Sequence, residues 1–423
     1  MKVLILSTSE GTGGAAVAAN RLMNALSKSG VSVKMLVRDR KSDDPRVVAL
    51  NDRLAFKRFN FIRFVWERLI IFLCNHLRRT SLFQVSIANT GTDISHHPLV
   101  EEADIIHLHW VNQGFLSLLD IKRLIETGKP VVWTMHDMWP CTAICHYSYG
   151  CERFHDSCGC CPFLYSHWKF DLSYFTFQKK RFFKESKLQL VAVSSWLKEQ
   201  AMYSALTKGL PVEVIPNVID TDIFKPGDKD KAREELCLPR HKRILLMGAA
   251  RINNPIKGLD YLIRALSILK AEEQGADDSL FVVLFGGIKG DDSFLKQLPV
   301  SFEAMGLLHD TTKIAKLYMA ADVTVVPSLY ETFGQTIIEG MACGCPAVTF
   351  NNSGQTDIID HKKDGYLARY KDPEDLACGI RWALSHADDM SLKEACAQKV
   401  KDRYRESVVA EKYINLYQHL RKE

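Results

Sequence analysis

The chain has 423 residues, of which 47% are apolar and 25% are charged, and its net charge is +5 at pH 7. These values are typical of a globular protein of two to three domains, and they exclude a disordered chain, a collagen or a coiled-coil rod. The small positive excess is no indication of nucleic-acid binding. The first apolar run covers only residues 3–6, which is too short for a secretory signal, and no run is long enough for a spanning helix. A cytoplasmic protein is expected.

Strands and helices are predicted to alternate in the N-terminal half. A short apolar strand at residues 3–7 is followed by a glycine-rich turn, then by a helical pattern that Gly30 ends. Further strands are predicted at residues 31–37, 105–110, 131–136, 188–194 and 212–216. Alternation of this kind predicts a buried parallel sheet that helices cover.

The C-terminal half repeats the alternation after a polar passage. Residues 220–242 are rich in Lys, Asp, Glu and Pro, so they are the candidate connection between domains. Strands are then predicted at 244–249, 281–286, 323–327 and 347–350, and helices at 258–269, 312–320 and 334–343. The sequence therefore predicts an α/β protein with two doubly wound, Rossmann-like domains facing a central cleft. Their predicted bounds are 1–217 and 218–406, with a helix at 407–423 that packs back towards the first domain.

The turn Gly11-Thr12-Gly13-Gly14 lies between a predicted strand and a predicted helix. Glycines at such a turn let backbone amides approach a phosphate or a sugar at the helix N-terminus. Gly13 and Gly14 are therefore candidate ligand-binding residues, although a tight turn that serves only packing has the same pattern. Together with Asp39 after the second strand, the turn also fits an NAD-dependent dehydrogenase.

Four charged residues of the C-terminal half follow predicted strands, at the sheet edge where open α/β proteins bind ligands: Arg251, Lys257, Glu331 and Glu339. Two cations beside a helix N-terminus suit a diphosphate. Glu331 lies in a strand-to-helix loop, whereas Glu339 lies on the helix that follows. The two carboxylates are therefore expected to meet different parts of one ligand.

These motifs make the chain resemble the retaining nucleotide-sugar glycosyltransferases of family 4, which share the GT-B fold. The resemblance is to the exopolysaccharide (colanic-acid-type) biosynthesis subgroup, and it covers nearly the whole chain. The motifs that carry it are Arg251…Lys257-Gly258, Glu331-x₇-Glu339, Gly344-x-Pro346, Pro216-Asn217-Val218-Ile219-Asp220 and Asp364-Gly365-Tyr366-Leu367.

The resemblance implies roles for the charged residues. Arg251 and Lys257 would hold the donor diphosphate and stabilise the departing nucleotide. Glu339 would bind the nucleotide ribose, and Glu331 would face the donor sugar.

The resemblance also implies roles for uncharged residues and a histidine. The backbone amides of Phe333 and Gly334, expected to be accessible, would lie near the donor sugar. Gly13 and Gly14 would lie near the diphosphate and the acceptor, and His136 would contact the transferred sugar.

The expected function is transfer of a sugar from a UDP- or GDP-sugar to a glycan or lipid-linked acceptor, in polysaccharide or lipopolysaccharide assembly. No cofactor is expected for catalysis, because the Asp220-Thr221-Asp222 sequence is interpreted as a solvated turn and not as a metal site. Retention by front-face substitution and by a covalent intermediate both stay open. The alternatives are a nucleotide-sugar epimerase, an NAD-dependent dehydrogenase and a non-catalytic nucleotide-sugar sensor.

Six of the twelve cysteines fall between residues 141 and 161, inside a predicted insertion at 137–170. Cys145, Cys151, Cys158 and Cys161 have spacings that suit a structural zinc site, and the last pair has knuckle spacing. Cys141, Cys160, His146 and His155 are further candidate ligands. The alternative is a set of buried or disulfide-linked cysteines that order the loop without metal.

Residues 53–79 form a basic aromatic segment with seven Lys or Arg residues, among them Arg53, and one acid, Glu67. Six aromatic residues interleave with the cations. Such a helix suits an anionic membrane surface, so peripheral attachment to the inner face of the cell membrane is a candidate role. The alternative is a helix that buries its aromatic residues and leaves its arginines in water. Nucleic acid is not expected as a partner, because no nucleic-acid motif accompanies the segment.

Overall fold

The computed structural model describes residues 1–51, 54–272 and 279–422, so Arg53 of the basic aromatic segment lies outside the described residues. The chain forms two compact units. Residues Met1–Pro216 and Val409–Glu423 make up the first unit, and residues Asn217–Val408 make up the second. No helix among the described residues is long and apolar enough to cross a lipid bilayer.

The first unit is built on a seven-stranded sheet in which every neighbouring pair is parallel. Its strand order is β3-β2-β1-β4-β5-β6-β7. The strands are β1 (Lys2–Ser9), β2 (Ser32–Asp39), β3 (Val47–Ala49), β4 (Ile105–Leu108), β5 (Val131–Met135), β6 (Gln189–Ala192) and β7 (Val212–Val214). The order reverses between β1 and β4, as it does in doubly wound folds.

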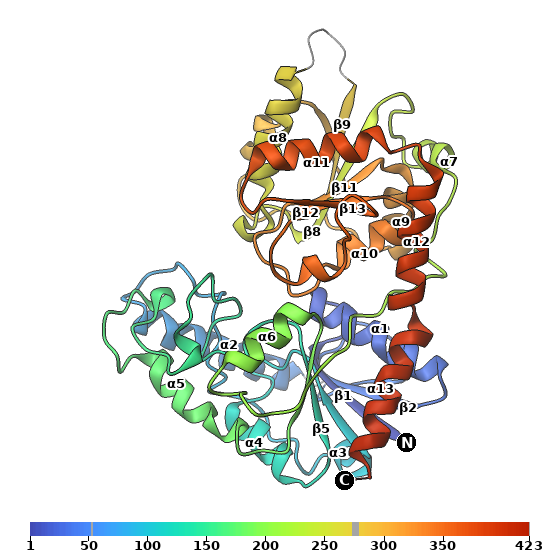
Figure 1. The fold of residues 1–423 in the computed structure, drawn as a ribbon. Helices are drawn as coiled ribbons and strands as arrows, with labels where there is room; N and C mark the ends of the chain where they lie inside the picture. The colour runs from blue at the N-terminus through green and yellow to red at the C-terminus, as the bar shows by residue number, and fades with distance from the viewer. Residues whose placement is uncertain (52–53, 273–278, 423) are drawn as a thin grey trace. The chain divides into compact units, whose positions relative to one another are not determined.

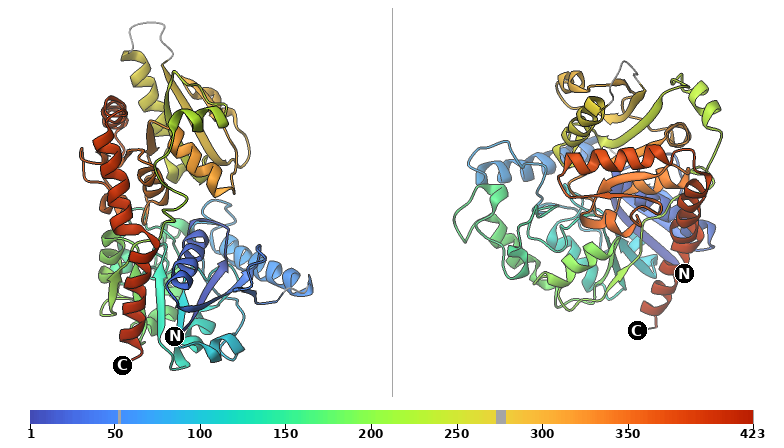
Figure 2. Two further views of the ribbon diagram at one scale, coloured as in Figure 1. Left: turned by 90° about the vertical axis from the view of Figure 1, so that its right-hand side faces the viewer. Right: turned by 45° about the horizontal axis from the view of Figure 1, so that its top comes forward.

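Six helices of the first unit connect these strands: α1 (Gly14–Lys28), α2 (Leu54–Cys74), α3 (Pro98–Glu102), α4 (Leu118–Glu126), α5 (Leu172–Lys180) and α6 (Ser195–Tyr203). Helix α13 (Glu406–Leu420) returns to this unit from residue 409 onwards. It runs beside the strands in both views of Figure 2, where it is red. The Tyr413 hydroxyl hydrogen-bonds to Thr134 Oγ1 at 2.8 Å, and the Tyr417 hydroxyl to His107 Nδ1 at 2.7 Å, so polar contacts inside the core fix this helix.

The second unit has a six-stranded parallel sheet in the order β10-β9-β8-β11-β12-β13. Its strands are β8 (Arg243–Arg251), β9 (Leu280–Gly287), β10 (Ser301–Ala304), β11 (Val323–Val326), β12 (Ala347–Phe350) and β13 (Gly365–Ala368). Its helices are α7 (Lys229–Glu235), α8 (Leu259–Glu272), α9 (Thr311–Ala320), α10 (Gln335–Ala342), α11 (Pro373–Ser385) and α12 (Met390–Tyr404). Helices α8 and α11 lie on one side of this sheet, and α9 and α10 on the other (Figure 1). Both sheets are Rossmann-like, as the sequence predicts.

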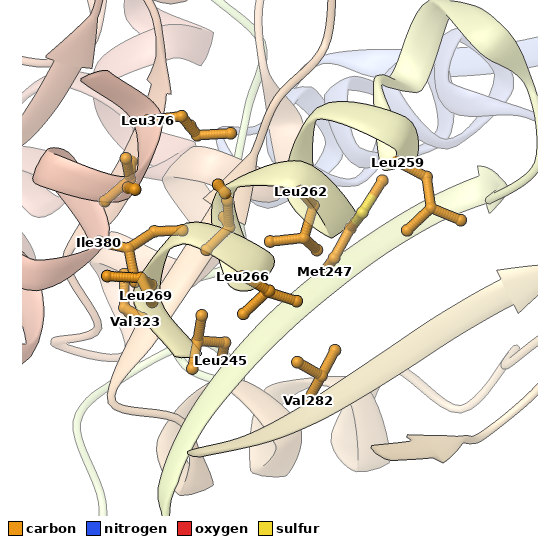
Figure 3. Packing of buried hydrophobic residues seen from close by; sticks show 14 of the residues in the cluster. Leu245, Met247, Leu259, Leu262, Leu266, Leu269, Val282, Val323, Leu376 and Ile380 are labelled. Carbon is orange, nitrogen blue, oxygen red and sulfur yellow. The ribbon is translucent and has the colours of Figure 1, made fainter. Parts of the chain in front are cut away.

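Helix α8 shows how the sequence specifies this packing. Four leucines recur every three or four residues, which places them on one face of the helix: Leu259, Leu262, Leu266 and Leu269. They point towards Leu245 and Met247 of β8 and Val282 of β9 (Figure 3). This apolar layer supports the strands whose carboxyl ends carry the candidate site.

The polar passage at residues 220–242 belongs to the second unit, because the division between the two units falls between Pro216 and Asn217. Residues Lys229–Glu235 of this passage form α7, which Asp228 caps. The buried Arg233 of α7 forms an ion pair with Asp322 at 2.8 Å. One charged residue of the passage thus satisfies a buried carboxylate.

Candidate functional site

The candidate site of the second unit lies where its strand order reverses, between β8 and β11. Lys257 ends the short helix η4 (Pro255–Lys257) after β8, and Glu331 lies in the loop after β11. Lys257 Nζ and Glu331 Oε1 are 2.6 Å apart. Both side chains keep some exposure, at 26% and 15%. The structure therefore brings two residues that are 74 positions apart into one ion pair, at the edge where open α/β sheets bind ligands.

Close backbone packing holds Lys257 in this position. Gly258 has φ +69°, and a Cβ there would lie 1.9 Å from the carbonyl oxygen of Pro327. The N–H of Leu329 donates to the Ile256 carbonyl at 2.8 Å. A glycine is needed after Lys257 because the loops that follow β8 and β11 touch at this point.

A second turn holds the Glu331 loop. The N–H of Glu331 donates to Ser353 Oγ at 3.0 Å, and the N–H of Gly354 donates to the Glu331 carbonyl at 2.8 Å. The carboxylate of Glu331 thus projects from a loop whose backbone is fixed on both sides. Ser353 is a supporting residue that the sequence did not suggest, because it lies 22 positions downstream in another loop.

Arg251 ends β8 and is exposed, and its side chain has no hydrogen-bond or ion-pair partner among the described residues. Glu339 is buried on α10, where the hydroxyl of Tyr318 donates to its Oε2 at 3.1 Å. The sequence did not suggest Tyr318, because its position depends on how α9 packs beside α10. The site thus offers one unpartnered cation, one ion pair and one buried, oriented carboxylate.

Phe333 and Gly334 precede α10. Gly334 has φ +124°, a backbone conformation that favours glycine. Phe333 is only 3% exposed, and its ring packs edge-on against Tyr404. Its side chain therefore fixes the start of α10, which leaves only backbone groups of this pair for a ligand.

In the first unit, the glycine-rich turn lies after β1, at the point where that sheet also reverses its order. Gly13 is the N-cap of α1 with φ +89°, and no side chain caps this helix end. A Cβ on Gly13 would meet no atom within 4 Å, so backbone conformation and not space requires the glycine. Gly14 is the first helical residue.

His136 follows β5 beside His109, which follows β4. His109 Nδ1 and His136 Nε2 are 2.8 Å apart. Burial lowers the pKa of His136 to about 4 and that of His107, which stacks near His109, to about 3. His136 is therefore neutral near pH 7 and can serve as a hydrogen-bonding group rather than as a cation.

The residue after His136 belongs to a separate network. Asp137 Oδ2 accepts from Trp110 Nε1 at 3.0 Å and contacts His146 Nδ1 at 2.6 Å. His146 Nε2 in turn contacts Ser86 Oγ at 3.1 Å. This network fixes the chain directly after His136, and it gives His146 partners other than a metal.

The predicted zinc ligands Cys145, Cys151, Cys158 and Cys161 line one small cavity of the first unit. All twelve cysteines are free thiols. Burial raises the pKa of the Cys158 thiol to about 12 and that of Cys161 to about 11.

Asp220 and Asp222 lie with Glu406 in a group whose carboxylate oxygens are all within 4.8 Å of one another. Asp220 Oδ1 also accepts the N–H of Asp222 at 2.9 Å, as in an Asx turn.

The basic aromatic segment forms α2, and the alternative that it buries its aromatic residues and leaves its arginines in water is wrong for Phe59, Phe61, Trp66 and Arg68. Apolar side chains are exposed along the helix: Phe59, Phe61, Ile62, Val65, Trp66, Leu69 and Leu73. Arg68 is buried, pairs with Glu67 at 2.8 Å and donates to the Val85 carbonyl at 2.9 Å. Arg68 therefore anchors the helix and is not one of the cations available to a surface.

Comparison with known proteins gives matches over both units. Residues 12–223 match the family model described as "Glycosyltransferase Family 4", and residues 228–403 match "Glycosyl transferases group 1". The chain is 35% identical over 175 residues to D-inositol 3-phosphate glycosyltransferase 2 of Catenulispora acidiphila, a match that covers 39% of this chain and 40% of that relative. The chain thus spans less than half the length of that curated relative.

Two solved structures share the fold of the whole chain. Sucrose-phosphate synthase of Thermosynechococcus elongatus has a TM-score of 0.68 at 20% identity, with 99% of each chain covered. The Anabaena protein HepE, in complex with UDP-glucose, has a TM-score of 0.63 at 17% identity, with 99% of this chain and 100% of that chain covered. The two Rossmann-like sheets are therefore those of the GT-B fold.

Proposed function

The chain belongs to glycosyltransferase family 4, and from this premise we propose that it transfers a sugar, with retention, from a UDP- or GDP-sugar to a glycan or lipid-linked acceptor. The observation that carries the proposal is the Lys257–Glu331 ion pair at the reversal point of the second sheet, with the exposed Arg251 at the end of β8. The UDP-glucose complex of a structural neighbour supports the donor class. Assembly of polysaccharide or lipopolysaccharide is the proposed setting.

Breaking a sugar–phosphate bond builds negative charge on the leaving diphosphate. Arg251 has no partner to release among the described residues, so it can bind a phosphate directly. Lys257 would exchange part of its contact with Glu331 for a phosphate oxygen as that charge grows. Fixed cations at this position lower the energy of the transition state more than that of the bound donor.

The two glutamates would act on different parts of the donor. Glu331 is close to the cation that holds the phosphate, so its carboxylate would lie near the sugar carbon that becomes positively charged. Glu339 is held by Tyr318 and would accept hydrogen bonds from the ribose hydroxyls. Catalysis in this scheme uses no metal or cofactor.

Thermal-shift measurements with UDP-sugars, GDP-sugars and NAD test the donor class. A ligand at 100 times its dissociation constant stabilises a folded protein by about 2.7 kcal/mol, which is a readily measured shift. We expect one class of nucleotide sugar to raise the melting temperature of the native protein. This shift should be largely lost in Lys257→Ala and should persist in the control Lys296→Ala, which replaces an exposed lysine. A shift with NAD alone would favour a dehydrogenase. Conversion of the donor without an acceptor to an epimer or free sugar would favour an epimerase.

We further propose that α2 attaches the protein to an anionic membrane surface. Ile62, Val65, Trp66, Leu69 and Leu73 occupy positions i, i+3, i+4, i+7 and i+11 of α2, which share one face, and they are 42–60% exposed, as membrane-surface helices require. Exposed cations lie at both ends of this helix, at Arg58 and at Arg78 and Arg79 just beyond it. An apolar face flanked by cations suits acidic headgroups, and a lipid-linked acceptor would be presented there.

A further inference from the structure

Four of the six clustered cysteines line one small cavity, and the thiols of the other two have contacts elsewhere. Cys145, Cys151, Cys158 and Cys161 line a cavity of about 20 Å³, together with apolar side chains such as Phe154. The Cys141 thiol instead donates to Met135 Sδ at 3.7 Å, and the Cys160 thiol to the His167 carbonyl at 3.5 Å. The fold thus gathers around one small space the four cysteines that have the spacing x₅, x₆ and x₂.

The loop that carries the last pair is a tight turn with close backbone contacts. Cys160 has φ +46°, and Gly159 has φ +148° with room for no Cβ, because one would lie 2.3 Å from the Lys169 carbonyl oxygen. The Cys161 N–H donates to Asp171 Oδ2 at 2.7 Å, which holds the turn in place.

The buried amine of Lys180 lies within electrostatic reach of Cys145 and Cys158. The Lys180 side chain is fully buried, and its ammonium donates to the carbonyls of Trp139 at 2.7 Å and Thr142 at 3.0 Å. Both partners are neutral, and a buried charge without compensation is costly. Burial lowers the pKa of this amine well below its usual range, and nearby negative charge would act in the opposite direction. Four thiolates around a divalent ion carry a net charge of −2, which would favour the charged form of Lys180.

We propose that Cys145, Cys151, Cys158 and Cys161 bind one structural zinc ion as a closed tetrathiolate site. Binding of Zn²⁺ to the four thiols releases four protons, and no electrons are exchanged. Four protein ligands leave no position open for substrate, so the ion would order the loop and not take part in catalysis.

The thiols must move inwards to close the site. No three of these four sulfurs lie within 4.8 Å of one another. Among the described residues, the metal-binding side chains that meet this distance are those of Asp220, Asp222 and Glu406. Tetrahedral Zn–S bonds of about 2.3 Å would bring neighbouring sulfurs to about 3.8 Å. Rotation about the Cα–Cβ bonds of cysteine supplies movements of this size.

Metal analysis of the full-length protein, purified without added metal, tests the proposal. We expect about one zinc per chain, lost in Cys158→Ser and in Cys161→Ser but retained in the matched control Cys160→Ser. If the serine variants fail to fold, cobalt substitution of the native protein keeps the test decisive, because four thiolates give intense sulfur-to-cobalt absorption and a tetrahedral d–d spectrum. In a further measurement, the protein is denatured with chelator and without reductant, alkylated, and analysed by mass spectrometry. All twelve cysteines should then be modified. A metal-free protein, a disulfide among the four cysteines, or zinc retained in Cys158→Ser would overturn the proposal.

Discussion

The cations and the buried carboxylate of the second unit should affect different kinetic constants. Replacing Arg251 or Lys257 with alanine removes charge that faces the leaving diphosphate, so kcat should fall by about 10²-fold or more. Glu339→Ala removes a charge-assisted hydrogen bond of about 1.5–3 kcal/mol, which is made both to the bound donor in the ground state and to the donor in the transition state. The donor KM should therefore rise about ten- to a hundredfold. Steady-state kinetics with varied donor separates the two effects.

Two further variants sharpen this comparison. Tyr318→Phe keeps Glu339 but removes its 3.1 Å hydrogen bond, so the donor KM should rise less than in Glu339→Ala while kcat stays close to native. Lys296→Ala, an exposed cation away from the site, should behave as the native enzyme. Unchanged transfer by both Arg251→Ala and Lys257→Ala would remove the basis of the proposed mechanism.

Residue spacing alone predicted that Lys257 and Glu331 would lie at the same edge of one sheet, because the carboxyl ends of parallel strands share an edge. It could not predict their 2.6 Å ion pair, which depends on how Gly258 packs against Pro327. The supports of the site were equally hidden. Tyr318 and Ser353 carry no motif, and their positions result from packing between elements far apart in the chain.

The buried histidines of the first unit predict a dependence of stability on pH. His107 and His136 have pKa values of about 3 and about 4, because burial disfavours their charged forms, against about 6.5 in an unfolded chain. Below pH 6.5 the unfolded state therefore binds protons that the folded state does not. The free energy of unfolding should fall as pH falls from about 6.5 towards 4, by up to about 1.4 kcal/mol per pH unit for each histidine.

Urea unfolding of the full-length protein, followed through the transition of the first unit at several pH values between 7.5 and 5, measures how the free energy of unfolding changes with pH. His107→Gln removes one of the titrating groups, so its slope should be smaller than that of the native protein. An equal slope in both proteins would mean that His107 is not held neutral by the fold. Carboxyl groups whose pKa is lowered in the folded protein, such as that of Asp104, change the free energy of unfolding only at pH values below this range. They therefore do not obscure the comparison between the native protein and His107→Gln.

At the scale of single elements, α2 shows what composition can and cannot predict. The sequence indicated a basic aromatic helix, but it could not indicate which face would be buried. Glu67 accepts the N–H groups of Ile87 and Ala88 at 2.7 and 3.0 Å, and together with Arg68 it fixes the orientation of the helix. The exposed face is consequently apolar rather than basic.

The exposed face of α2 predicts binding to vesicles that contain anionic lipid. Trp66→Glu combined with Leu69→Glu should lower the partition coefficient by about tenfold or more, because it removes buried apolar area and adds repulsion from the headgroups. Added salt should weaken binding only in part, since the apolar contribution is not screened. Met390→Glu, at an equally exposed apolar position of the second unit, is the matched control and should bind as the native protein does. Failure of the native protein to bind anionic vesicles at low salt would contradict the proposal.

At the scale of the whole molecule, the buried central strands were predicted, and three of the four edge strands were not. The central strands β1, β4, β5, β8 and β11 read as apolar runs because both faces of a parallel sheet are covered. The missed strands β3, β10 and β13 lie at sheet edges and have only three or four residues, whereas the fourth edge strand, β7, was predicted. A strand of that length has little pattern to separate it from a loop unless, as in β4 and β11, all its residues are buried.

The division into two units predicts two separable unfolding transitions. Tyr417 and Leu266 are fully buried, in the first and the second unit respectively. Tyr417→Ala empties the space of an aromatic ring and removes the hydrogen bond to His107, which should cost the first unit about 3–5 kcal/mol. Leu266→Ala should cost the second unit about 2–5 kcal/mol. Differential scanning calorimetry should show that each variant lowers the temperature of one transition and leaves the other unchanged. A donor nucleotide should raise the temperature of only the transition that Leu266→Ala lowers. If both variants shift a single transition equally, the two units unfold together, and the separate stability of the nucleotide-binding half is rejected.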